Sequence, residues 1–158
     1  MFVAFRAITY ATLFVGFLLL YLPARVLAWS GIHPPAAIDV QQVLGIAIAT
    51  AGAALALWCV VSFAWLGKGT PAPFDPPRHL VVRGPYRFVR NPMYIGASLA
   101  LGGAALFYGS LPLLEYAVVF LFAASLFVLG YEEPRLRRTF GPEYEAYCRH
   151  VCRWLPRA

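Results

Sequence analysis

The chain has 158 residues, of which 61% are hydrophobic and 13% are charged. Its mean hydropathy of +0.67 excludes an ordinary water-soluble domain and favours an integral membrane protein. The net charge is +6, but the basic residues lie beside apolar segments and not in a separate basic domain, so we expect no nucleic-acid partner.

Four uncharged intervals are candidate membrane spans, since each helical crossing needs roughly 20 apolar residues. They are residues 7–24, 40–67, 91–114 and 116–131. We therefore predict an all-α protein, a four-helix transmembrane bundle followed by short cytoplasmic C-terminal helices. The length indicates a single domain, 1–158, with two helices in 1–67 and a loop, a helical hairpin and a tail in 68–158.

The first span is predicted to cover residues 5–22 and to end at Pro23. Arg6, the apolar segment after it and the small residues before Trp29 also resemble a cleavable signal peptide. We expect this segment to be retained as a membrane span.

Small residues recur every four positions on the second and third spans, which allows two helix backbones to approach closely. They are Gly45, Ala49 and Ala53 on the second span, and Gly96, Ala100 and Ala104 on the third. The third and fourth spans are joined by a tight turn over residues 108–112, so we predict an antiparallel hairpin. Such stripes serve packing within and between chains alike, and we expect a monomer.

The basic residues are concentrated in the central loop and the tail. The loop holds Lys68, Arg78, Arg83, Arg87 and Arg90, and the tail holds Arg135, Arg137, Arg138, Arg149, Arg153 and Arg157. The other two connections carry only Arg25 between them. Because loops rich in Lys and Arg stay on the cytoplasmic side, we predict that the loop, the tail and both termini are cytoplasmic.

After the fourth span the chain becomes polar, and Gly141 followed by Pro142 divides this region into two short helices. The second helix is predicted to lie along the membrane surface, because apolar residues recur at helical spacing. These residues are Tyr144, Tyr147, Cys148, Val151 and Leu155. Cys148, His150 and Cys152 supply too few ligands for a tetrahedral site, so we expect no bound metal.

Four sequence elements, in this order and spacing, resemble the isoprenylcysteine carboxyl methyltransferase and phospholipid methyltransferase superfamily. They are Leu80-Val81-x-x-Gly84-Pro85-Tyr86, Arg90-Asn91-Pro92-Met93-Tyr94-x-Gly96, Glu132-Glu133, and Phe140-Gly141-x-Glu143-Tyr144-x-x-Tyr147 running to Val151 and Pro156. Eukaryotic isoprenylcysteine enzymes usually have Arg-His-Pro at the second element. The chain has Asn91 there, which is similar to the bacterial branch, so no histidine role is carried over.

The resemblance implies an enzyme of the bacterial inner membrane that uses S-adenosylmethionine, releases S-adenosylhomocysteine and has its active site at the cytoplasmic face. The cofactor-binding residues that it implies are Leu80, Val81, Tyr86, Asn91, Pro92, Tyr94, Glu132 and Glu133. By this analogy Leu80 and Val81 contact adenine, and the glutamates hold the ammonium or the ribose. We expect Arg90 to pair with a carboxylate of donor or acceptor, and Arg90 and Glu133 to be the catalytic residues.

The expected acceptor is a lipophilic small molecule or lipidated group drawn from the membrane lipids. An isoprenylcysteine-type carboxylate is the first candidate, and a phospholipid amine or a small thiol is the alternative. An amine or thiol must also lose a proton, which His79 or a glutamate could accept, whereas a carboxylate needs no base.

Simpler interpretations of the same residues stay open. Glu132 and Glu133 could form solvated pairs with nearby arginines, and Arg87 and Arg90 could bind lipid headgroups. A four-helix exporter or lipid-binding scaffold would share the hydropathy and the basic loops. Such a protein would not require the glutamate pair and the asparagine-proline element together.

Overall fold

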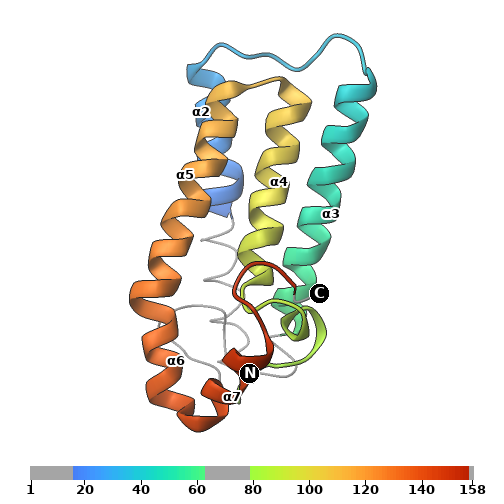
Figure 1. The fold of residues 1–158 in the computed structure, drawn as a ribbon. Coiled ribbons are helices and arrows are strands. Elements are labelled where there is room, and N and C mark those ends of the chain that lie inside the picture. The colour runs from blue at the N-terminus through green and yellow to red at the C-terminus, as the bar shows by residue number, and fades with distance from the viewer. Residues whose placement is uncertain (1–15, 63–78, 157–158) are drawn as a thin grey trace, which may run out of the picture.

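The computed structural model describes residues 16–62 and 79–156, and every regular element in this part of the chain is a helix (Figure 1). The elements are η1 Gly16–Tyr21, α2 Leu22–Trp29, α3 Val40–Ser62, η3 Gly84–Arg87, α4 Pro92–Tyr108, α5 Leu111–Phe127, η4 Val128–Glu132, α6 Glu133–Phe140 and α7 Pro142–His150. A parallel bridge between Val89 and Cys152 joins two irregular segments. The prediction of an all-α fold is confirmed for the described residues.

The long helices form a bundle in which α4 packs between α3 and α5, and α2 packs against α5 (Figure 1). Val40–Ser62 and the continuous helix Leu111–Phe140 are long and apolar enough to cross a membrane. Gly16–Trp29 and Pro92–Tyr108 are apolar but shorter. Within the described ranges two candidate spans are therefore supported, and a bundle of four spans stays a prediction.

Helices α3 and α4 touch backbone to backbone because glycines face each other. A methyl group added at Gly103 would lie 2.3 Å from the backbone nitrogen of Ala49, and one at Gly52 would lie 2.5 Å from that of Ala100. Neither position has room for a side chain. The prediction of close small-residue packing is therefore confirmed for this pair of helices.

The contact stripe on α3 differs from the predicted one after its first turn. Ala53 is exposed, and the buried positions after Gly45 are Gly52, Cys59 and Ser62. A helix has 3.6 residues per turn, so a strict four-residue step drifts off the contact face, whereas an alternation of four and three residues stays on it.

The turn between α4 and α5 agrees with the predicted hairpin. Gly109 ends α4 in the left-handed conformation, with φ of 58°, and the Ser110 hydroxyl accepts a hydrogen bond from Leu113 N at 3.2 Å. On α3, Gln41 Nε2 donates to the Leu106 carbonyl at 2.8 Å. These bonds satisfy backbone groups that helix ends otherwise leave unpaired.

The prediction that the first helix ends at Pro23 is wrong, because η1 continues into α2 as far as Trp29. Pro23 closely follows a π-helical turn inside this helix, and such irregular turns accompany a proline that lacks the N–H donor of the regular helix. The Tyr116 hydroxyl donates to the Leu18 carbonyl at 2.8 Å and so ties this segment to α5. The predicted start of this span, residues 5–15, lies outside the described residues.

Candidate active site

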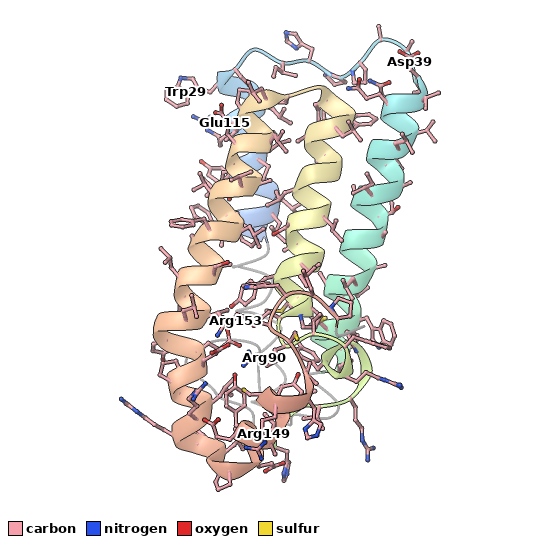
Figure 2. The ribbon with its side chains drawn as sticks, viewed as in Figure 1. Trp29, Asp39, Arg90, Glu115, Arg149 and Arg153 are labelled. Carbon is pink, nitrogen blue, oxygen red and sulfur yellow. The ribbon has the colours of Figure 1, made fainter. Side chains whose placement is uncertain are left out.

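The sequence elements predicted to form one site lie at the same end of the bundle. In Figure 2, Arg90, Arg149 and Arg153 lie at this end, whereas Asp39 and Glu115 lie at the other. We call the first one the basic end. It brings together the segment before α4, the junction of α5 with α6, helix α7 and the tail that follows α7.

A carboxylate clamped by two arginines forms the centre of the basic end. Glu133 is 5% exposed. Arg153 binds both of its oxygens, with Nε to Oε1 at 2.7 Å and Nη2 to Oε2 at 2.9 Å. Arg90 Nη1 lies 3.2 Å from Oε1. A buried carboxylate requires such partners because it has lost its hydration, and a two-pronged arginine contact is the strongest single one available.

Arg90 has one donor group that is left without an acceptor. Its Nη1 also donates to Cys148 Sγ at 2.8 Å, and its backbone N donates to the Cys152 carbonyl at 2.9 Å. The side chain is 12% exposed, yet Nε has no hydrogen-bond partner among the described residues. Buried guanidinium donors are rarely left unpaired, so this atom is a candidate contact for an acceptor atom of a ligand.

The neighbouring glutamate has a different environment. Glu132 is half-buried, and its Oε2 accepts a hydrogen bond from the Tyr94 hydroxyl at 3.3 Å. The π-helical turn η4 ends at Glu132, and α6 begins at Glu133. Such turns carry an inserted residue and occur often at functional sites. Here the two carboxylates diverge, one toward α4 and one toward the arginine pair.

Two tyrosines connect α7 to the core of the bundle. The Tyr147 hydroxyl donates to the Tyr86 carbonyl at 2.6 Å, and Tyr86 itself is buried beside Cys59 and Val81. Burial raises the pKa of the Tyr86 and Tyr147 hydroxyls well above the usual value, so both stay protonated. Tyr86 and Val81 therefore pack the segment before α4 onto α3.

The remaining predicted residues lie around this centre. Asn91 is 6% exposed, and its Nδ2 donates to the Arg153 carbonyl at 3.3 Å. Pro92 is buried as the first residue of α4, and Leu80 is half-buried. The structure thus brings Arg90, Tyr94 and the two glutamates together, while Asn91 holds the tail.

The apolar face of α7 is covered by other segments of the chain, and the predicted position of this helix along the membrane surface stays a prediction. Its apolar face packs inward, with Tyr144 2% exposed and Cys148 against Arg90. The helix ends at His150, so Leu155, at 75% exposed, does not continue that face. The predicted pattern had the right period, but periodicity does not say whether a membrane or another segment covers the face.

Arg153 is the residue at this centre that the sequence pattern did not assign. It was expected only as one of the basic tail residues. Its partner lies 20 positions earlier, beyond the reach of any local helical spacing. Within the part of the chain that the structure describes, no cluster of three or more His, Cys, Asp or Glu residues could hold a metal ion.

Comparison with known families gives one match. The sequence model of a family described as phospholipid methyltransferase matches residues 40–143. The matched region runs from the start of α3 into the first turn of α7, and so contains Arg90, Tyr94 and both glutamates but not Arg153. No curated protein and no solved structure matches the chain significantly.

Proposed function

The chain belongs to the phospholipid methyltransferase family, and from this premise we propose that its basic end binds S-adenosylmethionine for methyl transfer to a lipophilic acceptor. The family and the apolar helices make the protein an integral membrane methyltransferase. The methyl donor, the orientation in the membrane and the acceptor belong to the proposal.

The observation that carries the donor assignment is the Nε of Arg90, which has no partner in the described part of the chain and lies next to the glutamate pair. The amino acid end of S-adenosylmethionine carries one carboxylate and one ammonium. A site for it needs a cation and an anion in close proximity. Arg90 offers the cation, and Glu132, which accepts a hydrogen bond from the Tyr94 hydroxyl, offers the anion.

The donor supplies a methyl group on a sulfonium, which is displaced directly by the acceptor. Such a reaction depends on alignment more than on acid-base chemistry, so the chain's residues act mainly by holding and orienting. We assign Arg90 to the donor carboxylate, Glu132 with Tyr94 to the ammonium, and Leu80 to the adenine. Glu133 is assigned to hold Arg90 in place, since its two oxygens are already bound by arginines.

The charge distribution supports a cytoplasmic basic end. Arginines cluster at this end, whereas the exposed Asp39 and Glu115 lie at the opposite one (Figure 2). Basic residues beside membrane spans are retained on the inner side. A water-soluble donor would then enter from the cytoplasm, and the acceptor would enter from the membrane.

We consider two classes of methyl acceptor. The family description favours a phospholipid amine, and His79 could accept the proton that an amine must lose. The sequence resemblance also supports an isoprenylcysteine-type carboxylate, which needs no base. A radiolabelled methyl donor, supplied with total membrane lipid, a prenylcysteine analogue or a small thiol, distinguishes these classes by the product that becomes labelled.

Calorimetric titration of the detergent-purified protein with S-adenosylmethionine and S-adenosylhomocysteine tests the donor assignment. We expect saturable binding that weakens about tenfold in Glu132→Gln, because a hydrogen bond to a charged group is lost. Glu115→Gln removes the same charge at the opposite end and should bind like the wild type (Figure 2). Wild-type protein that binds neither compound would contradict the proposed function.

A further inference from the structure

The tail that follows α7 turns back and lies against the segment before α4. Cys152 forms the parallel bridge with Val89, and its carbonyl accepts a hydrogen bond from Arg90 N at 2.9 Å. The Arg153 carbonyl accepts one from Asn91 Nδ2 at 3.3 Å. The backbone of the tail is thus fixed by the two residues that begin the Arg90-Asn91-Pro92 element.

From this fixed position, the Arg153 side chain reaches Glu133 and binds both oxygens. Arg90 touches only one of these oxygens, through one nitrogen. Two guanidinium groups and one carboxylate leave one excess positive charge in the cluster. Within this cluster, the Nε of Arg90 still has no acceptor among the described residues.

We propose that Arg153 is a positioning residue of the donor site, which keeps the charge of Arg90 available for an anionic group of the ligand. Without Arg153, the buried carboxylate of Glu133 would keep its salt bridge to Arg90 and would draw that guanidinium into a two-pronged pair. The cluster would then be neutral. This inference rests on the proposed function, and it concerns a residue outside the matched family region.

A purely structural role for Arg153 makes a different prediction. If Arg153 only fastens the tail, its loss should weaken every ligand of the site alike. If it sets the charge at Arg90, its loss should weaken only ligands that carry a carboxylate. S-adenosylhomocysteine has an amino acid end, whereas 5′-methylthioadenosine has the same nucleoside without it.

The experiment compares the dissociation constants of these two compounds for the detergent-purified full chain. The variants are Arg153→Gln and Arg153→Lys, with Arg138→Gln on the exposed side of α6 as the matched control. We expect Arg153→Gln to weaken the binding of S-adenosylhomocysteine about tenfold and the binding of 5′-methylthioadenosine by less than about twofold. The affinity of Arg153→Lys for S-adenosylhomocysteine should lie between those of the wild type and Arg153→Gln, because an ammonium cannot bind both carboxylate oxygens as a guanidinium does.

Equal weakening of both compounds, or no weakening of either, would overturn the role of Arg153. Wild-type protein that binds neither compound would instead contradict the proposed function, and the inference would fall with it. The melting temperature of each variant is recorded in parallel. If Arg153→Gln does not fold, Arg153→Lys carries the same test, since the ratio of the two affinities is compared within one variant.

Discussion

The contact between α3 and α4 and the cluster of Glu133, Arg90 and Arg153 meet opposite requirements within one bundle. At the helix contact, Gly52 and Gly103 have no side chain because the facing backbone fills the space. In the cluster, Glu133 is equally enclosed but must be surrounded by donors. We therefore expect an added atom to destabilise the first region and a lost charge to destabilise the second. Burial alone therefore says little about which substitution a position accepts.

The largest effect is expected where a charge is removed from the enclosed cluster. Glu133→Gln leaves Arg90 and Arg153 without their carboxylate, which we expect to lower the free energy of unfolding by about 3 kcal/mol. Thermal unfolding in detergent measures the change. Glu143→Gln, at an exposed position of α7, is the control. Equal stability of the two variants would show that the cluster does not require its charge.

The second-largest loss of stability is expected when a single methyl group is added at the contact between α3 and α4. Gly103→Ala places that group 2.3 Å from a backbone nitrogen of α3, so the helices must separate, at a cost of about 2 kcal/mol. Gly102→Ala, its neighbour, meets no atom within 4 Å and should be neutral or slightly stabilising. If both variants unfold at the same temperature, the glycine contact is not required.

Tyr94 lies two residues before Gly96 on α4, and its hydroxyl contacts Glu132, so it separates ligand binding from packing. Tyr94→Phe removes the hydroxyl that donates to Glu132 and should weaken S-adenosylhomocysteine binding about fivefold with little change in melting temperature. Tyr108→Phe, at the other end of α4, is the matched control. Lower stability with unchanged affinity would give Tyr94 a packing role only.

The smallest effect is expected for an ion pair of similar geometry that is exposed to solvent. Arg137 Nη1 and Glu145 Oε1 lie 2.7 Å apart, and the two side chains are 50% and 44% exposed. Arg137→Ala should change the free energy of unfolding by less than about 0.5 kcal/mol, because water screens the pair. A loss of stability as large as that of Glu133→Gln would mean that burial does not determine how much these ion pairs stabilise the fold.

The sequence predicted the features that depend on local spacing. The α4–α5 turn follows from Gly109 and Pro112, and the shared location of Arg90 and the glutamates follows from the alternating direction of successive helices. Glycine and alanine spacing predicted close helix contact, although a four-residue step named Ala53 where the 3.6-residue turn places Gly52 on the face.

The features that the sequence did not predict depend on contacts between distant segments. Arg153 has the same local pattern as the other tail arginines, and only the return of the chain beside Val89 brings it to Glu133. The inward face of α7 was missed for the same reason. Hydrophobic periodicity shows that a face is covered, but the covering segment, here the one carrying Tyr86, is set by tertiary folding.

The π-helical turn at Val128–Glu132 affects how this protein should be compared with its relatives. One inserted residue rotates everything after it by roughly 100° relative to an uninterrupted α-helix. A relative without that turn would align with a one-residue gap inside what is otherwise a continuous helix. Such a gap would not mark a loop. It would mean that the residue next to the aligned glutamate, and not that glutamate itself, faces the arginines.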